Sequence, residues 1–216
     1  MRGAGILDRA WGMKGAFYVA RGEPARIAAA ASAVSLRAQA ADLPIRIASD
    51  GPIPGFDCIP LPPECDAGGR AAKIRILELV PWDQVLYLDA DTFVLTDPSV
   101  GFRLLADGWD LALSPSDKQE AESLWHVTEG EREITFDQVG YRPLQLQCGV
   151  MFIRRSPETV TFMAVWLEEF NRWGGQDQAA FIRALNRVPL RVYLLGRPFN
   201  GGAVIAHHFG RARERA

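Results

Sequence analysis

Two aspartates separated by one residue, Asp89 and Asp91, follow directly after the apolar run 85–88 (VLYL). In an extended chain, residues two apart point the same way, so both carboxylates can converge on one point. Because neighbouring carboxylates repel each other, a cation between them is favoured, and Mn²⁺ or Mg²⁺ shared with a substrate phosphate is the natural candidate. The alternative is that one aspartate caps the next turn while the other is solvated. The apolar run before them favours the metal site.

The elements around this run must place the aspartates. A continuous apolar run is typical of a strand that is buried on both faces of a sheet. Upstream of it, the pattern predicts strands over 16–20 and 45–48 and helices over 25–40 and 69–80. This alternation indicates an α/β fold with parallel central strands, in which ligands bind at the carboxyl ends of the strands.

The second half of the chain alternates less regularly. The pattern predicts strands over 111–113, 144–153, 190–195 and 203–208, and helices over 157–173 and 176–186. Residues 114–142 are polar and acidic without a sustained period, and we interpret them as an irregular surface insertion. Since there is no internal repeat, linker or second core, we expect residues 1–216 to form a single domain.

Composition excludes several classes of function. The chain has 216 residues, of which 48% are hydrophobic, and a net charge of −2, which argues against disorder and against nucleic-acid binding through a large basic surface. No apolar run is long enough for a transmembrane segment, and no signal peptide is recognised, so we expect a cytoplasmic location. A basic tail, residues 211–215, leaves contact with the inner face of a membrane open.

Four motifs resemble, in order, those of family GT8 of the GT-A nucleotide-sugar glycosyltransferases, which includes glycogenin and bacterial lipooligosaccharide galactosyltransferases. They are residues 73–91 (KIRILELVPWDQVLYLDAD), residues 146–151 (LQCGVM), Gln176-Asp177-Gln178, and His207-x-x-Gly210-x-x-Arg213. Two departures are Gln147 for the family's asparagine and Arg213 for its lysine. The resemblance spans residues 15–213 and implies one GT-A domain, with a mixed, mostly parallel central sheet flanked by helices.

The resemblance also implies roles for individual residues. Asp89, Asp91 and His207 would hold Mn²⁺ or Mg²⁺, with His208 as the alternative to His207. The residues expected to contact the nucleotide-sugar donor are Ala20, Arg70, Lys73, Asp89, Gly210 and Arg213. Asp177 and Gln178 would be catalytic residues that face the sugar or its acceptor. Alternatively, Lys73 is a solvated helix lysine, and Asp177 only begins a helix, where the helix dipole favours an acid.

The implied function is metal-dependent transfer of a sugar, with retention, from a nucleotide diphosphate sugar to a saccharide, lipid-linked or protein acceptor. UDP is the expected nucleotide, and GDP or CDP stay open. Two alternatives also stay open. Asp89 could be the nucleophile of a haloacid-dehalogenase-like phosphatase, although Phe93 stands where that family has threonine. The chain could also be a non-catalytic binding protein on the GT-A fold.

Overall fold

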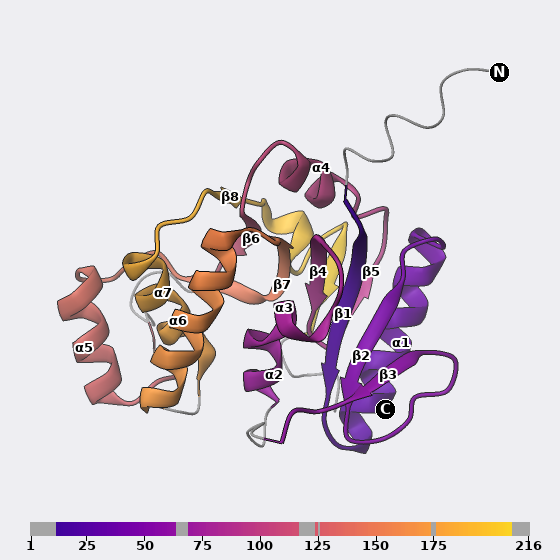
Figure 1. Cartoon of the computed structure of the whole chain (residues 1–216), viewed down its shortest axis with the longest axis horizontal. Helices are drawn as coiled ribbons and strands as arrows, with labels where there is room; N and C mark the ends of the chain where they lie inside the picture. Colours follow the sequence, from indigo (N-terminus) through magenta and orange to yellow (C-terminus); the bar gives the residue numbers. More distant parts are fainter. Residues whose placement is uncertain (1–11, 64–68, 117–123, 125, 174–175, 209–216) are drawn as a thin grey trace.

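The computed structural model describes residues 12–63, 69–116, 124, 126–173 and 176–208. A seven-stranded sheet lies at its centre, in the order β3-β2-β1-β4-β7-β6-β8 (Figure 1). Its strands are β1 (Lys14–Ala20), β2 (Ile45–Ser49), β3 (Asp57–Pro60), β4 (Gln84–Leu88), β6 (Leu111–Pro115), β7 (Leu146–Arg154) and β8 (Val192–Leu194). Strand β7 is antiparallel to both of its neighbours, and the other neighbouring strands are parallel. The mixed, mostly parallel sheet predicted from the sequence is therefore confirmed.

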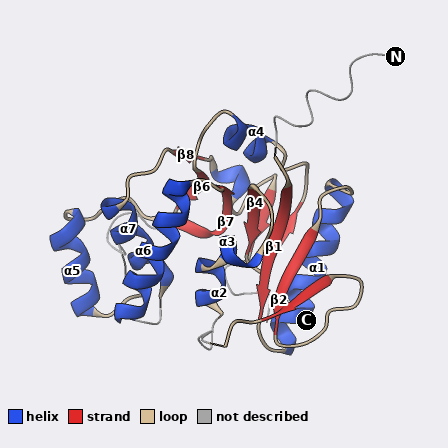
Figure 2. Ribbon diagram, viewed as in Figure 1, coloured by secondary structure: helices blue, strands red, loops and turns tan. Residues whose placement is uncertain are grey.

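Helices cover both faces of this sheet (Figure 2). Helices α1 (Glu23–Gln39) and α4 (Val100–Ala106) pack on one face, and α2 (Arg70–Ile74), α3 (Ile76–Leu79), α6 (Pro157–Trp173) and α7 (Asp177–Arg187) on the other. Every side chain of β4 is buried. Leu86 and Leu88 pack in the apolar core between the sheet and α1, and Val85 and Tyr87 pack in the core on the other face, with α6. Among the described helices, none combines the length and apolar character needed to cross a membrane.

One predicted helix is broken in two. The sequence predicted a continuous helix over 69–80, whereas α2 ends at Ile74, α3 begins at Ile76, and Arg75 between them has φ −89° and ψ 14°. In a straight helix, side chains two residues apart point about 200° away from each other. The break allows Ile74 and Ile76 to be fully buried in the same core.

The predicted irregular insertion contains a helix, so that prediction was wrong in part. Helix α5 (Glu129–Val139) begins at Thr128, whose hydroxyl accepts a hydrogen bond from the backbone N–H of Glu131 at 3.3 Å. Thr128 and Glu131 have the spacing of a capping box, which is the signal that the periodicity argument missed. Its buried face includes Glu131 and Thr135, so α5 shows no clear apolar period. Residues 117–123 and 125 of this segment lie outside the described residues.

A buried arginine explains the polar face of α5. The side chain of Arg183 on α7 is 0% exposed, and its guanidinium donates to Glu131 Oε1 at 3.1 Å and to Glu169 Oε2 at 2.9 Å. It also donates to Thr135 Oγ1 at 2.7 Å. One guanidinium therefore joins α5, α6 and α7, and it satisfies two carboxylates that would be costly to bury alone.

Replacing Arg183 by methionine is expected to lower the free energy of unfolding by about 3 kcal/mol or more at pH 7, because Glu131 and Glu169 would lose their buried cation. The two carboxylates differ: at Glu131 burial outweighs the contacts with Arg183 and raises the pKa, whereas at Glu169 burial is outweighed by hydrogen bonds from Arg183 and Arg187, which lower the pKa. A lowered pKa contributes stability that is present above the unfolded-state pKa and is lost as the pH falls through the folded-state pKa.

The difference between wild type and Arg183→Met should therefore shrink below about pH 4, near the ordinary glutamate pKa. Urea denaturation at pH 7 and pH 3.5 measures both values. Arg132→Met is the control, since Arg132 lies 4.0 Å from Glu129 at the surface of α5 and its loss should cost less than about 1 kcal/mol. A pH-independent difference would argue against the buried ion pairs as its cause.

Candidate functional site

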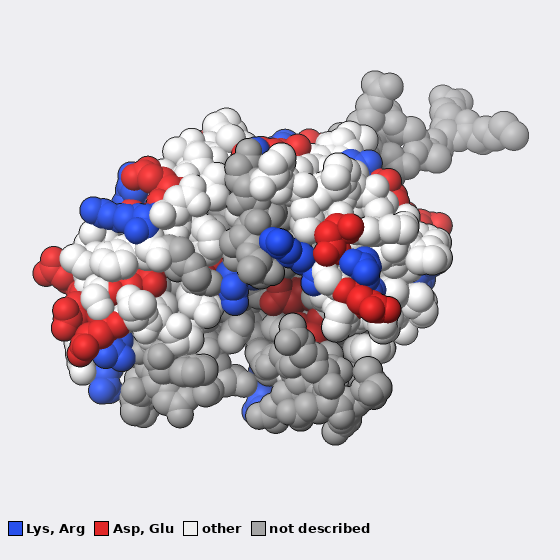
Figure 3. Space-filling model, turned by 90° about the horizontal axis from the view of Figure 1, so that it is seen from below, with Lys and Arg blue, Asp and Glu red and all other residues white. Residues whose placement is uncertain are grey.

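The carboxyl ends of the parallel strands β1, β2 and β4 meet at one face of the molecule, and both aspartates lie there. Asp89 and Asp91 occupy the turn between β4 and β5 (Thr92–Val94). Figure 3 looks onto this face and shows acidic side chains recessed near its middle, with basic side chains beside them. Acidic and basic side chains therefore lie next to each other on this face (Figure 3).

Thr92 fixes the shape of this turn. Its backbone N–H and its hydroxyl both donate to the carbonyl of Asp89, at 3.2 Å and 2.9 Å. The same hydroxyl lies 3.0 Å from Ser32 Oγ on α1 and is fully buried. Thr92 also pairs with His207, because β5 runs antiparallel to β9 (Ile205–His207). This two-stranded pairing brings a histidine from the far end of the sequence to the aspartates.

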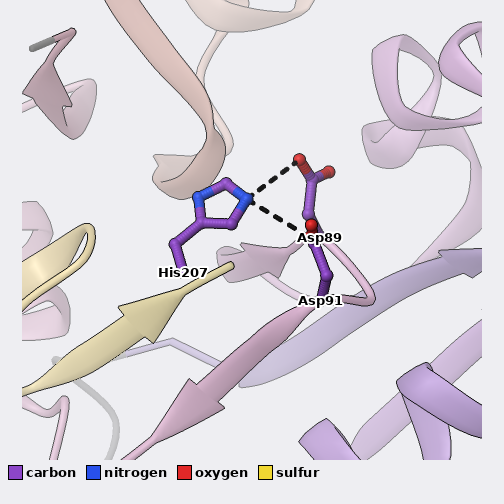
Figure 4. A group of neighbouring side chains, drawn as sticks. All are labelled: Asp89, Asp91 and His207. Atoms are coloured by element: carbon purple, nitrogen blue, oxygen red, sulfur yellow. Dashed lines mark ion pairs between the residues drawn. The ribbon is translucent and has the colours of Figure 1, made fainter. Parts of the chain in front are cut away.

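Asp89, Asp91 and His207 point toward one another (Figure 4). His207 Nε2 lies 3.2 Å from Asp91 Oδ1 and 3.9 Å from Asp89 Oδ2. One ligand atom of each residue lies within 4.8 Å of the other two, and no other such group occurs in the described part of the chain. Two carboxylates and an imidazole suit Mn²⁺ or Mg²⁺. We call these three residues the Asp-Asp-His trio.

The structure distinguishes the two adjacent histidines. The backbone N–H of His208 donates to the carbonyl of Asp91 at 3.1 Å, and its ring lies edge-on against Phe93, with centroids 6.0 Å apart. It is His207 whose ring nitrogen approaches both carboxylates.

Gly149 makes room for the trio, and the sequence prediction gave it no role. A Cβ at this position of β7 would lie 2.3 Å from His207 Cε1 and 2.7 Å from Asp89 Oδ2, closer than Cβ atoms approach. The carbonyl of Gly149 accepts the backbone N–H of Asp89 at 2.8 Å. The motif at 146–151 contained this glycine, but only the fold shows which side chains it accommodates.

Lys73 is buried beside the trio. Its Nζ lies 2.7 Å from Asp177 Oδ2 and 3.5 Å from Asp89 Oδ1. Burial acts to lower its pKa, but these two carboxylates raise the pKa well above its ordinary value, so the ammonium stays charged. The hydroxyl of Tyr87 donates to Asp89 Oδ1 at 2.7 Å. Lys73 is therefore not a solvated helix lysine, because it joins α2 to both α7 and the trio.

Asp177 and Gln178 begin α7 and are tied into the same region. Burial acts to raise the pKa of Asp177, but Lys73 and then Arg70, whose Nε lies 3.9 Å from Asp177 Oδ1, lower it. The Gln178 amide donates to the carbonyl of Leu146 at 2.9 Å. The structure thus places an ionised carboxylate close to the trio. Contact of Asp177 or Gln178 with a sugar or an acceptor stays a prediction.

The remaining predicted donor contacts have different outcomes. Ala20 lies at the carboxyl end of β1, but its methyl group is fully buried in the core beneath α1. A contact with a nucleotide would therefore come from its backbone. Gly210 and Arg213 lie outside the described residues.

No family model matches the chain, and no curated protein matches its sequence. Solved structures do match. The galactosyltransferase LgtC, in complex with donor and acceptor sugar analogues, is 18% identical, with 94% of this chain and 82% of that chain covered and a TM-score of 0.55. Mouse xyloside xylosyltransferase 1 is 14% identical, with 85% of each chain covered and a TM-score of 0.56. The bifunctional glycosyltransferase WbbM is 13% identical, with 91% of this chain and 40% of that chain covered and a TM-score of 0.63. The chain therefore has the GT-A fold that its motifs predicted.

Proposed function

We propose that the protein is a metal-dependent glycosyltransferase that moves a sugar from a nucleotide diphosphate sugar to a saccharide, lipid-linked or protein acceptor. The observation that carries this proposal is the convergence of Asp89, Asp91 and His207 at the end of β4, in a chain with the fold of glycosyltransferases. We propose UDP as the nucleotide and transfer with retention of the anomeric configuration, because the sequence motifs resemble those of family GT8. A cytoplasmic location, with or without contact to a membrane surface, belongs to the same proposal.

The Asp-Asp-His trio would hold the cation through the oxygens and nitrogen that approach one another, Asp89 Oδ2, Asp91 Oδ1 and His207 Nε2. When bound, Mn²⁺ or Mg²⁺ supplies positive charge that offsets the charge growing on the departing diphosphate. The second oxygen of Asp89 is held by Tyr87 and Lys73, which leaves Oδ2 turned toward His207. These contacts orient the Asp89 carboxylate within the trio.

Residues around the trio would position the two sugars. Asp177 stays ionised beside Lys73 and Arg70, and we propose that it faces the transferred sugar or the acceptor together with Gln178. A carboxylate near the anomeric carbon can orient a hydroxyl or stabilise positive charge on the ring. Lys73 and Arg70, with the backbone of Ala20 and with Gly210 and Arg213, complete the proposed donor contacts.

The wild-type protein is expected to gain thermal stability from UDP and Mn²⁺ together, beyond the sum of their separate effects. At about a hundredfold excess over Kd, stabilisation of about 2.7 kcal/mol corresponds to a Tm increase of about 5–10 °C. The protein should also release UDP from a UDP-sugar, and EDTA should abolish this release. GDP and CDP, tested in the same way, identify the preferred nucleotide.

Each rival function gives a different result in these assays. Phosphate release from a phosphomonoester, without a response to nucleoside diphosphates, would favour the phosphatase with Asp89 as nucleophile. Stabilisation by UDP and Mn²⁺ without turnover of any nucleotide sugar would favour the non-catalytic binding protein. No response to any nucleoside diphosphate would contradict the proposed function.

A further inference from the structure

Asn200 lies behind His207, on the side of the ring that faces away from the aspartates. Its side chain is buried, with 5% of the residue exposed, and its Oδ1 lies 2.7 Å from His207 Nδ1. The opposite ring nitrogen, Nε2, is the one that approaches Asp91 and Asp89. No sequence motif pointed to Asn200.

The loop that carries Asn200 is closed by its own hydrogen bonds. After the short 3₁₀ helix Arg197–Phe199, the chain reverses at Gly201, whose φ is +98°. The N–H of Gly201 donates to the carbonyl of Ile205 at 2.9 Å, and that of Val204 to the carbonyl of Pro198 at 2.8 Å. These bonds fix the loop to the start of β9, so the amide of Asn200 is held directly behind the imidazole.

The contact selects one form of the imidazole. An amide oxygen only accepts hydrogen bonds, so Nδ1 carries the hydrogen and donates it to Asn200 Oδ1. In the neutral ring the lone pair is then on Nε2, facing the two carboxylates. The reversed amide would donate to Nδ1 and leave the hydrogen on Nε2, where it would occupy the position of a cation. His207 can bind a cation only through a free lone pair on Nε2, so a metal site here requires the orientation of the Asn200 amide that the structure has.

We propose that Asn200 is a positioning residue for the metal site. It holds the ring of His207 and its Nδ1–H tautomer, so that Nε2 is available to Mn²⁺ or Mg²⁺. Outer partners of metal-bound histidines fix ring orientation and tautomer in this way. This inference rests on the proposed function, because it requires a cation at the Asp-Asp-His trio.

Mn²⁺ affinity of the full chain tests this role, measured from the electron paramagnetic resonance signal of free Mn²⁺. Asn200→Ala is expected to weaken binding by about 10–100-fold. Asn200→Asp keeps an acceptor for Nδ1–H and should recover most of that loss. Asn186→Ala is the matched control, because the Asn186 amide donates to the backbone carbonyl of Gln138 at an exposed position, and this variant should bind Mn²⁺ as wild type does.

A double-mutant cycle and the tautomer separate positioning from a general structural effect. Asn200→Ala should cost no further Mn²⁺ affinity in a His207→Ala background, because Asn200 acts through that ring. The chain has 3 histidines, so ¹⁵N-histidine spectra with Mg²⁺ present should resolve His207 as the Nδ1–H tautomer. That form should be lost in Asn200→Ala and restored in Asn200→Asp.

Different experimental results would overturn the role of Asn200 and the proposed function. Equal Mn²⁺ affinity of Asn200→Ala and wild type, or an Nε2–H tautomer in wild type, would overturn the role of Asn200 and leave the metal site standing. No Mn²⁺ binding by wild type would overturn both. If Asn200→Ala does not fold, the wild-type tautomer and the affinity of Asn200→Ser decide the question.

Discussion

Replacing Asp91 by asparagine is expected to lower the rate of metal-dependent UDP release from a UDP-sugar by more than about a thousandfold. The amide has nearly the shape of the carboxylate, so the turn between β4 and β5 should keep its form. What changes is the charge: the trio loses one of its two anionic ligands, and a neutral amide replaces the carboxylate whose Oδ1 lies 3.2 Å from His207 Nε2. The initial rate of UDP release over a wide Mn²⁺ range measures this effect.

Asp42→Asn is the matched control for this substitution. Asp42 is exposed in the turn between α1 and β2, so removing its charge should leave both the rate and the Tm unchanged. Comparing the two variants separates the loss of a metal ligand from the loss of one negative charge on the protein. A wild-type rate for Asp91→Asn across the whole Mn²⁺ range, including limiting Mn²⁺, would contradict the assignment of Asp91 to the metal site.

The sequence predicted those helices and strands in which apolar residues form a continuous run or recur at a regular spacing. The run 85–88 lies within β4, and the predicted helix over 157–173 is α6 with the same bounds. The Asp-Asp-His trio was predicted because its residues lie in ordered motifs. The pairing of β5 with β9 that joins them was not predicted, since three-residue strands carry too short a pattern to specify a partner.

The parts that could not be predicted are polar contacts between segments far apart in the sequence. Lys73 and Asp177 are 104 residues apart, and their ion pair exists only because α2 and α7 pack on the same face of the sheet. The ion pair of Arg183 with Glu131 buries a charged residue on the inward face of α5, so α5 has no apolar period by which the sequence could reveal it. Asn200 lies behind His207 because a loop returns on itself. In each case the partner is set by tertiary packing, so local propensity carries no signal.

Gly149→Ala is expected to lower both Mn²⁺ affinity and the rate of UDP release by about a hundredfold, because it displaces a ligand of the metal site. The new methyl group would lie 2.3 Å from His207 Cε1, so a neighbouring group must move. Asp89 is the less movable neighbour, because Tyr87 and Lys73 hold its other oxygen and its N–H bonds to β7. The His207 ring should therefore rotate away and leave the trio. Mn²⁺ titration and UDP release measure the loss.

Gly130→Ala is the control, because it adds the same methyl group at a position away from the trio. A Cβ on Gly130, in the first turn of α5, would lie 3.8 Å from Trp173, which is ordinary contact, and alanine there should be neutral or stabilise the helix by up to about 1 kcal/mol. Gly149→Ala moves the end of a side chain rather than the backbone, so overpacking should cost about 1–3 kcal/mol and leave the protein folded. A folded Gly149→Ala variant that binds Mn²⁺ like wild type would show that the trio does not need His207 in its observed position. Loss of Mn²⁺ binding in a folded Gly149→Ala variant would show that the metal site needs the space that a glycine leaves at position 149.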